Sequence, residues 1–331
     1  MDIPGKYKPG ALNSITDVPD VLVGHETIIN GSICTGVTVI SPCKGDIFLK
    51  PIPAAAAVGN GFGKMTGTPQ IEELGTIESL IGLTNTLSVP SVWQGLLDYH
   101  IPNLPEGYTI NIVVGETNDG QLNDIHGCHI TPIHVKKAIE NLSKNVTEGN
   151  VGAGAGTVCF GFKGGIGTAS RLVEIGSDET KTEYSVGALV QSNYGGSLTV
   201  YGKPISKPKN TKQNDGSCMI VVLTDAPLSD RQLKRVAKRG LIGMTNTGSY
   251  MGNGSGDFCI AASNFEKNRP VRPTDNVSII GQEYYFLSDF EINPIFEAAA
   301  EAVQEALYNS LTMATAMENK NKVYPSLADV L

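Results

Sequence analysis

One junction in the sequence places a glycine and a serine where acyl chemistry is possible. Residues 244–263, MTNTGSYMGNGSGDFCIAAS, run through Gly248 and Ser249 into an apolar stretch typical of a strand. A glycine permits backbone angles that other residues avoid, so the peptide bond after Gly248 can be held strained. The Ser249 hydroxyl can then attack the preceding carbonyl, and hydrolysis of the resulting ester leaves a chain that begins at Ser249. The α-amine of that chain, with a pKa of about 8, can serve as the base for the hydroxyl of the same residue.

An ordinary Gly-Ser turn is the alternative, and this motif on its own favours the turn.

Glycine-rich segments elsewhere do not add a phosphate-binding site. Residues 59–67 read GNGFGKMTG, but Met65 stands where a P-loop needs Ser or Thr, and Val58 stands where it needs glycine. Residues 152–161, GAGAGTVCFG, do not fit the pattern G-x-G-x-x-G from any starting glycine. Tight turns and close strand packing are the favoured interpretation of both segments.

Three histidines, His126, His129 and His134, lie close together in the sequence, with Asp124 and Cys128 nearby. Their spacing matches no named metal-binding motif, so a turn that leads into a helix is the favoured interpretation and no metal site is predicted. The sequence also lacks the G-x-S-x-G pattern of α/β-hydrolases.

The elements that must position these residues follow from hydrophobic periodicity. Runs rich in β-branched and apolar residues predict strands at 21–28, 34–41, 108–117, 184–196 and 217–228. The pair Asn30-Gly31 lies between the first two runs and predicts a hairpin. Apolar residues at helical spacing predict helices at 70–89, 132–145, 228–240 and 295–317.

Boundary residues and connections refine this prediction. Gly240 is expected to end the helix at 228–240, and Pro294 suits the first turn of the helix at 295–317. Residues 201–216 are polar, basic and contain prolines, which predicts a long exposed loop. Strands come in runs with helices between the runs, so we expect antiparallel or mixed sheets sandwiched by helices.

Composition excludes several classes of protein. Of the 331 residues, 40% are hydrophobic and 18% are charged, and 38 are glycine, which suits a globular protein with buried sheets. The net charge of −8 argues against nucleic acid as a partner, and no apolar run of about 18 residues predicts a membrane span. The N-terminus lacks an apolar signal core, and the six cysteines are scattered without a CxxC pair. Buried free thiols and a cytoplasmic location are therefore expected.

Segments along nearly the whole chain together resemble the DmpA-type aminopeptidases. These self-processing hydrolases include L-aminopeptidase/D-amino-acid esterase-amidases and β-peptidyl aminopeptidases, and their nucleophile is an N-terminal serine or threonine. The segments that carry the resemblance occur in the order of that family, at 13–27, 60–67, 83–89, 113–131, 152–171, 186–195, 221–240 and 247–263.

The resemblance implies a fold and a processing event. The expected fold is of the α+β class, a single αββα four-layer sandwich over residues 1–331. Cleavage between Gly248 and Ser249 would give a large subunit, 1–248, and a small subunit, 249–331. The family also implies that the processed heterodimers form homo-oligomers, and that the substrates are short peptides or aminoacyl amides and esters, with no cofactor and no metal.

The resemblance also assigns roles to residues. Ser249 matches the nucleophile, and Asn193 in SNYG matches the asparagine that stabilises the oxyanion. Glu116 in GETNDG matches the acid that holds the free amine of the substrate. A further serine and acid assist the nucleophile in this family, and they precede the last long helix. Ser288 and Glu291 are the corresponding prediction, with Asp289 as a competing choice for the acid.

Three positions depart from the family. Asn118 stands where an active-site tyrosine is common, so it is taken as a substrate-binding position with an altered preference. Lys64 stands where an acid is common, and Asn246 replaces a frequent arginine. The predicted function is a self-processing serine aminopeptidase or amidase that forms an acyl-enzyme on Ser249. An acyltransferase of related architecture and an unprocessed, non-catalytic binding protein are the alternatives.

Overall fold

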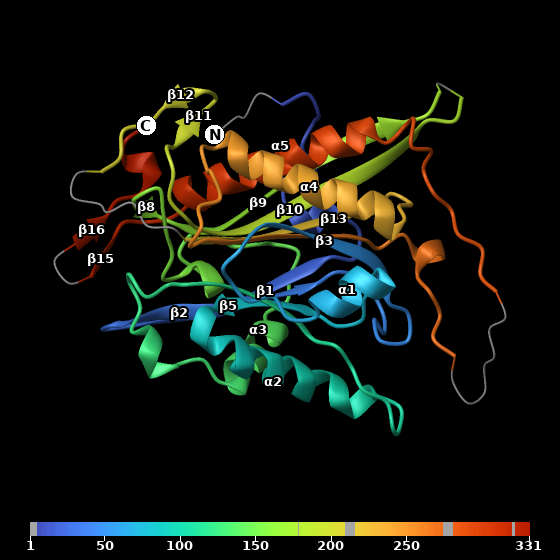
Figure 1. Ribbon diagram of the computed structural model, residues 1–331, viewed down its shortest axis with the longest axis horizontal. Coiled ribbons are helices and arrows are strands. Elements are labelled where there is room, and N and C mark those ends of the chain that lie inside the picture. Colours follow the sequence, from blue (N-terminus) through green and yellow to red (C-terminus); the bar gives the residue numbers. More distant parts are fainter. Residues whose placement is uncertain (1–4, 178, 209–215, 274–280, 320–321) are drawn as a thin grey trace.

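Helices and sheets stack in four layers in the computed structural model, which describes residues 5–177, 179–208, 216–273, 281–319 and 322–331 (Figure 1). One sheet has the strand order β1 (Leu22–Asn30), β2 (Ile33–Ser41), β5 (Ile81–Asn85) and β6 (Val113–Thr117). The other has the order β4 (Thr76–Ile77), β3 (Ile52–Gly61), β14 (Gly256–Ser263), β13 (Ser217–Thr224), β10 (Thr182–Asn193) and β9 (Gly165–Ile175).

Two pairs of helices cover the outer faces of the sheets. Helices α2 (Val89–His100) and α3 (Pro132–Glu140) pack on the four-stranded sheet. Helices α4 (Asp230–Asn246) and α5 (Asn293–Thr312) pack on the six-stranded sheet. The predicted αββα sandwich of the α+β class is confirmed (Figure 1).

Strand β13 shows why the sheets are apolar on both faces. Cys218, Ile220 and Val222 face the core beneath α4 and α5. The intervening Met219, Val221 and Leu223 face the core between the two sheets. Because both faces of the strand are covered, its sequence is a continuous apolar run rather than an alternating one.

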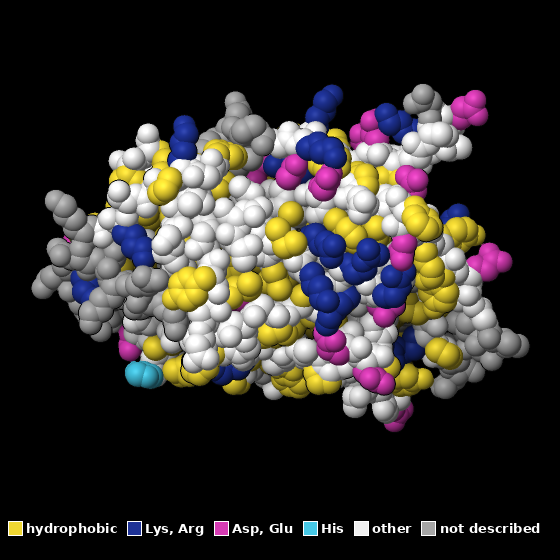
Figure 2. Space-filling view, turned by 45° about the horizontal axis from the view of Figure 1, so that its top comes forward, with side chains coloured by type: hydrophobic (Ala, Val, Ile, Leu, Met, Phe, Trp, Pro, Cys, Tyr) yellow, Lys and Arg dark blue, Asp and Glu magenta, His cyan; other side chains and the backbone are white. Residues whose placement is uncertain are grey.

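Helix α4 is amphipathic, with an apolar face toward the sheet and a charged face toward solvent. Its buried residues include Leu233, Val236 and Ala237, which pack toward the sheet. Lys and Arg side chains gather over its outer face in Figure 2, with acidic side chains beside them. Asp289 pairs with two of these arginines, Arg231 and Arg235. The basic run is therefore largely a solvated and ion-paired helix face.

The predicted hairpin at the N-terminal end of the first sheet is confirmed. Strands β1 and β2 pair antiparallel, with Asn30 opposite Ile33, and Gly31 has a φ of 58° in the turn between them. Helix α5 begins as predicted, with Pro294 in its first turn. The sequence predicted longer elements in several places, since β6 covers only Val113–Thr117, α3 ends at Glu140, β13 ends at Thr224 and α5 ends at Thr312.

The prediction of one helix at 70–89 is wrong. Helix α1 spans only Thr68–Leu74 and ends at Gly75, whose φ of 64° closes the helix with a left-handed cap. The chain then forms the edge strand β4 and the fully buried strand β5. A short apolar run fits a buried strand and a buried helix equally well, and here the glycine decides between them.

Gly240 does not end the helix predicted at 228–240. Helix α4 continues through it to Asn246, and Gly240 is buried against β14. A Cβ at this position would lie 2.6 Å from the Sγ atom of Cys259. The glycine therefore serves close packing of the helix on the sheet rather than capping.

The loop predicted at 201–216 is partly structured. Strands β11 (Thr199–Val200) and β12 (Lys203–Pro204) form a small hairpin before and within it, and residues 209–215 lie outside the described part of the chain. Two further small hairpins pair β7 (Val158–Cys159) with β8 (Phe162–Lys163) and β15 (Met317–Asn319) with β16 (Lys322–Tyr324). Within the described ranges, no helix has the length and apolar character needed to cross a membrane. Five cysteines are buried and Cys128 is exposed, all of them as free thiols.

Candidate active site

Several of the residues predicted to do chemistry lie together where strands of the two sheets end, and this line of strand ends is called the site edge of the sheets. In the six-stranded sheet, β10 is antiparallel to β13, β13 is parallel to β14, and β14 is antiparallel to β3. The C-terminal ends of β10 and β3 therefore lie at the same edge as the N-terminal ends of β13 and β14. The register confirms this, because Asn193 pairs with Ser217, Ser217 with Gly256, and Gly256 with Gly61.

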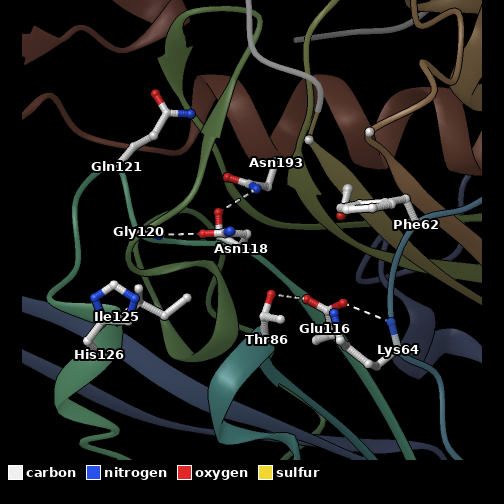
Figure 3. A pocket seen from close by; sticks show the side chains of 13 residues that line it. Phe62, Lys64, Thr86, Glu116, Asn118, Gly120, Gln121, Ile125, His126 and Asn193 are labelled. Atoms are coloured by element: carbon white, nitrogen blue, oxygen red, sulfur yellow. Dashed lines mark hydrogen bonds between the residues drawn. The ribbon is translucent and has the colours of Figure 1, made fainter.

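A cavity of about 440 Å³ opens at this edge, between the two sheets. Strand β6 of the four-stranded sheet ends here and contributes Glu116. The structure thus brings together Glu116, Asn118 and Asn193, which the sequence predicted as site residues (Figure 3). Other lining residues include Phe62, Lys64, Thr86, Ile125 and His126.

Glu116 is a buried carboxylate held in a fixed orientation. Its side chain is only 2% exposed. The Lys64 backbone N–H donates to Oε1 at 2.9 Å, and the Thr86 hydroxyl donates to Oε2 (Figure 3). Burial raises the pKa of Glu116, while the bonds from Thr86 and Lys64 and the charge of Lys64 oppose that rise. A carboxylate of this kind can receive an ammonium group in a charge-assisted hydrogen bond.

Asn193 is fixed by hydrogen bonds at both ends of its amide. The Val158 backbone N–H donates to Oδ1 at 2.9 Å, and Nδ2 donates to the Asn118 carbonyl at 2.8 Å. These partners determine which end of the amide is the nitrogen. Because an amide nitrogen carries two hydrogens, one N–H remains for an oxyanion on the cavity side.

Asn118 contributes through its backbone as well as its side chain. Its carbonyl accepts from Asn193, and its side-chain oxygen accepts from the Gly120 N–H at 3.0 Å. The second bond is an Asx turn, which holds the loop after β6 in place. The side chain is exposed at the cavity wall, where a substrate would meet it.

Ser249 lies two residues beyond Thr247, the C-cap residue of α4, and is 8% exposed. Its Oγ accepts a hydrogen bond from the Met251 N–H at 3.2 Å. Ser249 lines a separate small cavity of about 10 Å³, room for about one water, together with Tyr194, Gly216 and Ser255. Gly216 also lines the large cavity, so the two cavities share a wall.

Ser288, Asp289 and Glu291 do not lie beside Ser249, so the predicted placement of the assisting serine and acid is wrong. The segment is anchored at the start of α4, where the Leu287 N–H donates to the Pro227 carbonyl at 2.9 Å. Ser249 follows the other end of that helix, and its 17 residues span about 25 Å. Ser288 accepts from the Phe290 N–H at 3.2 Å, and Glu291 is exposed.

A different hydroxyl and carboxylate lie next to the small cavity. Ser255 lines it with Ser249, and the Ser255 Oγ donates to Oδ1 of Asp257 at 2.8 Å. Both side chains are buried. The sequence contained a usable indication of this pair, because Ser-Gly-Asp follows Ser249 within eight residues and leads into the strand that fixes its position.

The three histidines have separate surroundings. His126 lines the large cavity, whereas the His129 Nε2 atom lies 3.1 Å from Asp124 Oδ2. His134 is hydrogen-bonded to Thr131 at the start of α3. Among the described residues, no group of three or more His, Cys, Asp and Glu side chains is placed to hold a metal ion.

The chain is similar in sequence and in fold to known proteins. The model of peptidase family S58 matches residues 13–324. The β-peptidyl aminopeptidase BapA of Sphingosinicella microcystinivorans is 37% identical over 97% of this chain and 86% of its own length. A β-aminopeptidase structure from Burkholderia sp. is 36% identical with a TM-score of 0.90, covering 98% of this chain and 93% of that one. The L-aminopeptidase D-Ala-esterase/amidase of Ochrobactrum anthropi, described as a variant of the Ntn hydrolase fold, is 33% identical with a TM-score of 0.88 and the same coverage.

Proposed function

This chain belongs to peptidase family S58 and is a hydrolase with aminopeptidase and amidase activity, and we propose that Ser249 becomes its nucleophile when the chain cleaves itself after Gly248. The observation that carries this proposal is the arrangement at one sheet edge. Ser249 in its small cavity lies across a shared wall from the large cavity that holds Glu116 and Asn193.

The proposed turnover uses three groups. The Ser249 Oγ attacks the carbonyl carbon of the substrate, and the α-amine of Ser249 takes the hydroxyl proton. The oxyanion that forms accepts a hydrogen bond from the free N–H of Asn193. When the tetrahedral intermediate collapses, the α-amine gives the proton that it took to the leaving amine or alcohol. Water then attacks the acyl-enzyme by the same route and releases the acid, which restores the Ser249 hydroxyl.

Glu116 accounts for the choice of an aminopeptidase over an endopeptidase. A peptide with a free N-terminal amine places a cation against this buried carboxylate. An acylated N-terminus has no such cation, so a bound acylated peptide would leave the buried carboxylate without a cationic partner. The proposed substrates are therefore short peptides, aminoacyl amides and aminoacyl esters.

We assign Ser255 and Asp257 to the position that Ser288 and Glu291 were expected to fill. Their hydrogen bond supplies a buried acceptor at the wall of the Ser249 cavity. In that place the pair would orient the hydroxyl and the new α-amine of Ser249. The division into 1–248 and 249–331, a cytoplasmic location and assembly into a homo-oligomer remain predictions from the sequence.

The decisive experiment is the intact mass of the purified protein under denaturing conditions. We expect two fragments, 1–248 and 249–331, from the wild-type chain and a single chain from Ser249→Ala. Ser91→Ala, at a serine on α2 that lines neither cavity, is the matched control and should cleave like the wild type. Mature protein should then hydrolyse aminoacyl amides. A stable full-length wild-type chain would contradict the proposal.

A further inference from the structure

The segment 196–199 forms a strap of backbone hydrogen bonds over the residues that precede Ser249. The Ser197 N–H donates to the Gly248 carbonyl at 3.1 Å, and the Thr199 N–H donates to the Thr247 carbonyl at 2.9 Å. The Thr199 hydroxyl also donates to the Asn246 carbonyl at 3.1 Å. Three successive carbonyls at the end of α4 thus have donors from one short segment.

Two glycines make this close approach possible. Gly196 has a φ of 137°, and a Cβ added there would lie 2.4 Å from the Gly248 carbonyl oxygen. Gly248 has a φ of 107°, and a Cβ there would lie 1.9 Å from the Ser197 carbonyl oxygen. Any side chain at either position would push the two backbones apart, so the glycines maintain the hydrogen bond to the Gly248 carbonyl.

We propose that the Ser197 backbone N–H is the oxyanion donor for self-cleavage, whereas Asn193 serves the later turnover of substrate. This inference rests on the proposed function, since it concerns the cleavage that creates the nucleophile. The Gly248 carbonyl already accepts from Ser197 before any bond changes, and that is where the charge of the tetrahedral intermediate develops.

Asn193 has a different place. Its amide lines the large cavity, where substrate binds, and its known partners are the Val158 N–H and the Asn118 carbonyl. Gly248 lines neither cavity. The two carbonyls that Ser249 attacks, one in its own chain and one in the substrate, would therefore be polarised by separate donors.

The bonds in the cleavage step balance without a cofactor. The Ser249 Oγ forms a bond to the Gly248 carbonyl carbon, and the negative charge moves to the oxygen held by Ser197. Collapse breaks the bond to the Ser249 nitrogen, which takes the hydroxyl proton and becomes the free α-amine. Water then hydrolyses the ester, giving a carboxylate at Gly248 and the hydroxyl of Ser249.

The test is a time course of fragment formation, measured by intact mass. Gly196→Ala should slow cleavage about 100-fold or more, the effect of losing one oxyanion donor. Gly202→Ala is the matched control, because Gly202 also has a positive φ, 74°, but a Cβ there meets nothing within 4 Å. That control should cleave at the wild-type rate. Each variant is compared with Ser249→Ala for its melting temperature, so that misfolding is recognised.

A second variant removes only the donor. Replacing the backbone amide of residue 197 by an ester, through incorporation of the corresponding hydroxy acid, deletes the N–H and keeps every side chain. It should also cleave about 100-fold more slowly, while the fraction that has cleaved turns over substrate normally. Cleavage of this folded ester variant at the wild-type rate would overturn the inference alone. A wild-type chain that never cleaves would overturn the proposed function and the inference with it.

Discussion

In the proposed turnover, Glu116 selects which end of a peptide the cavity accepts. Replacing Glu116 with Gln keeps the shape of the side chain and its acceptor for the Lys64 N–H, but removes the charge. We expect kcat/KM for substrates with a free amine to fall about 10- to 100-fold, the range for hydrogen bonds to charged groups. Cleavage after Gly248 should be unaffected. Glu73→Gln, at an exposed position on α1, is the control, and an unchanged kcat/KM in E116Q would contradict the role.

The pH dependence of turnover follows from the same side chain. Burial raises the pKa of Glu116, so its neutral form persists to a higher pH than for an exposed glutamate. Binding of an ammonium needs the ionised form, so kcat/KM should fall as the pH drops through this raised pKa. The α-amine of Ser249, with a pKa of about 8, must be neutral to act as the base, so both proteins should share one acid limb. The wild type should show a second limb at lower pH, still above the ordinary glutamate range, and E116Q should lack only this second limb. A second limb in both proteins would assign it to another group.

Lys64 makes the cavity bipolar, because its side chain lines the same wall as Glu116 (Figure 3). Its charge lowers the pKa of Glu116 and also attracts a substrate carboxylate. Lys64→Met should reduce the preference for dipeptides with a free carboxylate over their amides by up to about fivefold, the strength of an exposed ion pair. Lys136→Met on α3 is the control, with a side chain 76% exposed. An unchanged acid-to-amide ratio would show that Lys64 does not contact the substrate end.

At the scale of elements, the sequence predicted a turn or a helix start correctly where a single residue type determines it. The Asn30-Gly31 turn fixes the β1–β2 hairpin, and Pro294 fixes the start of α5. The 70–89 segment failed because Gly75 caps a helix inside a run that has helical spacing throughout. Whether a glycine caps, turns or permits close packing depends on its neighbours in space, which a single sequence does not contain.

Gly240 provides a test of packing between α4 and β14. Alanine is the better helix former, yet its Cβ would lie 2.6 Å from Cys259 Sγ. We expect Gly240→Ala to lower the free energy of unfolding by about 1–3 kcal/mol, as measured by urea denaturation. Cys259→Ala removes the obstructing atom, so the double variant should lose less than the sum of the two single variants. Simple additivity would show that the contact with Cys259 is not the source of the loss.

The candidate site was predictable in its chemistry and less so in its assembly. The roles of Ser249, Asn193 and Glu116 were predicted from the resemblance to the DmpA-type family, since the Gly-Ser motif alone favoured a turn. The strand pairing explains why the end of the strand that carries Asn193 and the start of the strand that follows Ser249 lie together. Ser288 and Glu291 were misplaced because a sequence gives only the distance along the chain. In space, the length of α4 separates these two residues from Ser249. Ser255 and Asp257 were missed as a pair, since their hydrogen bond depends on how the chain enters β14.

At the scale of the whole molecule, the position of the proposed cleavage site would allow the protein to be cut and to remain folded. Residues 249–331 contribute β14, which lies between β3 and β13 in the middle of the six-stranded sheet. They also contribute α5, which packs on β9, β10 and α4. The buried Arg171 in β9 joins the two parts by ion pairs to Glu301, at 3.1 Å, and Glu305, at 2.6 Å.

We therefore expect the two fragments to stay together until the fold itself is lost. Native mass spectrometry of the mature protein should show 1–248 and 249–331 as one complex that does not separate on dilution. Removing the small fragment would take a central strand out of the sheet and expose the core beneath α5, so dissociation costs as much as unfolding. The cleaved wild type and the uncleaved Ser249→Ala chain should accordingly unfold in a single transition at similar urea concentrations. Separation of the fragments on a native sizing column would contradict this prediction, because it would show that β14 can leave the sheet without unfolding.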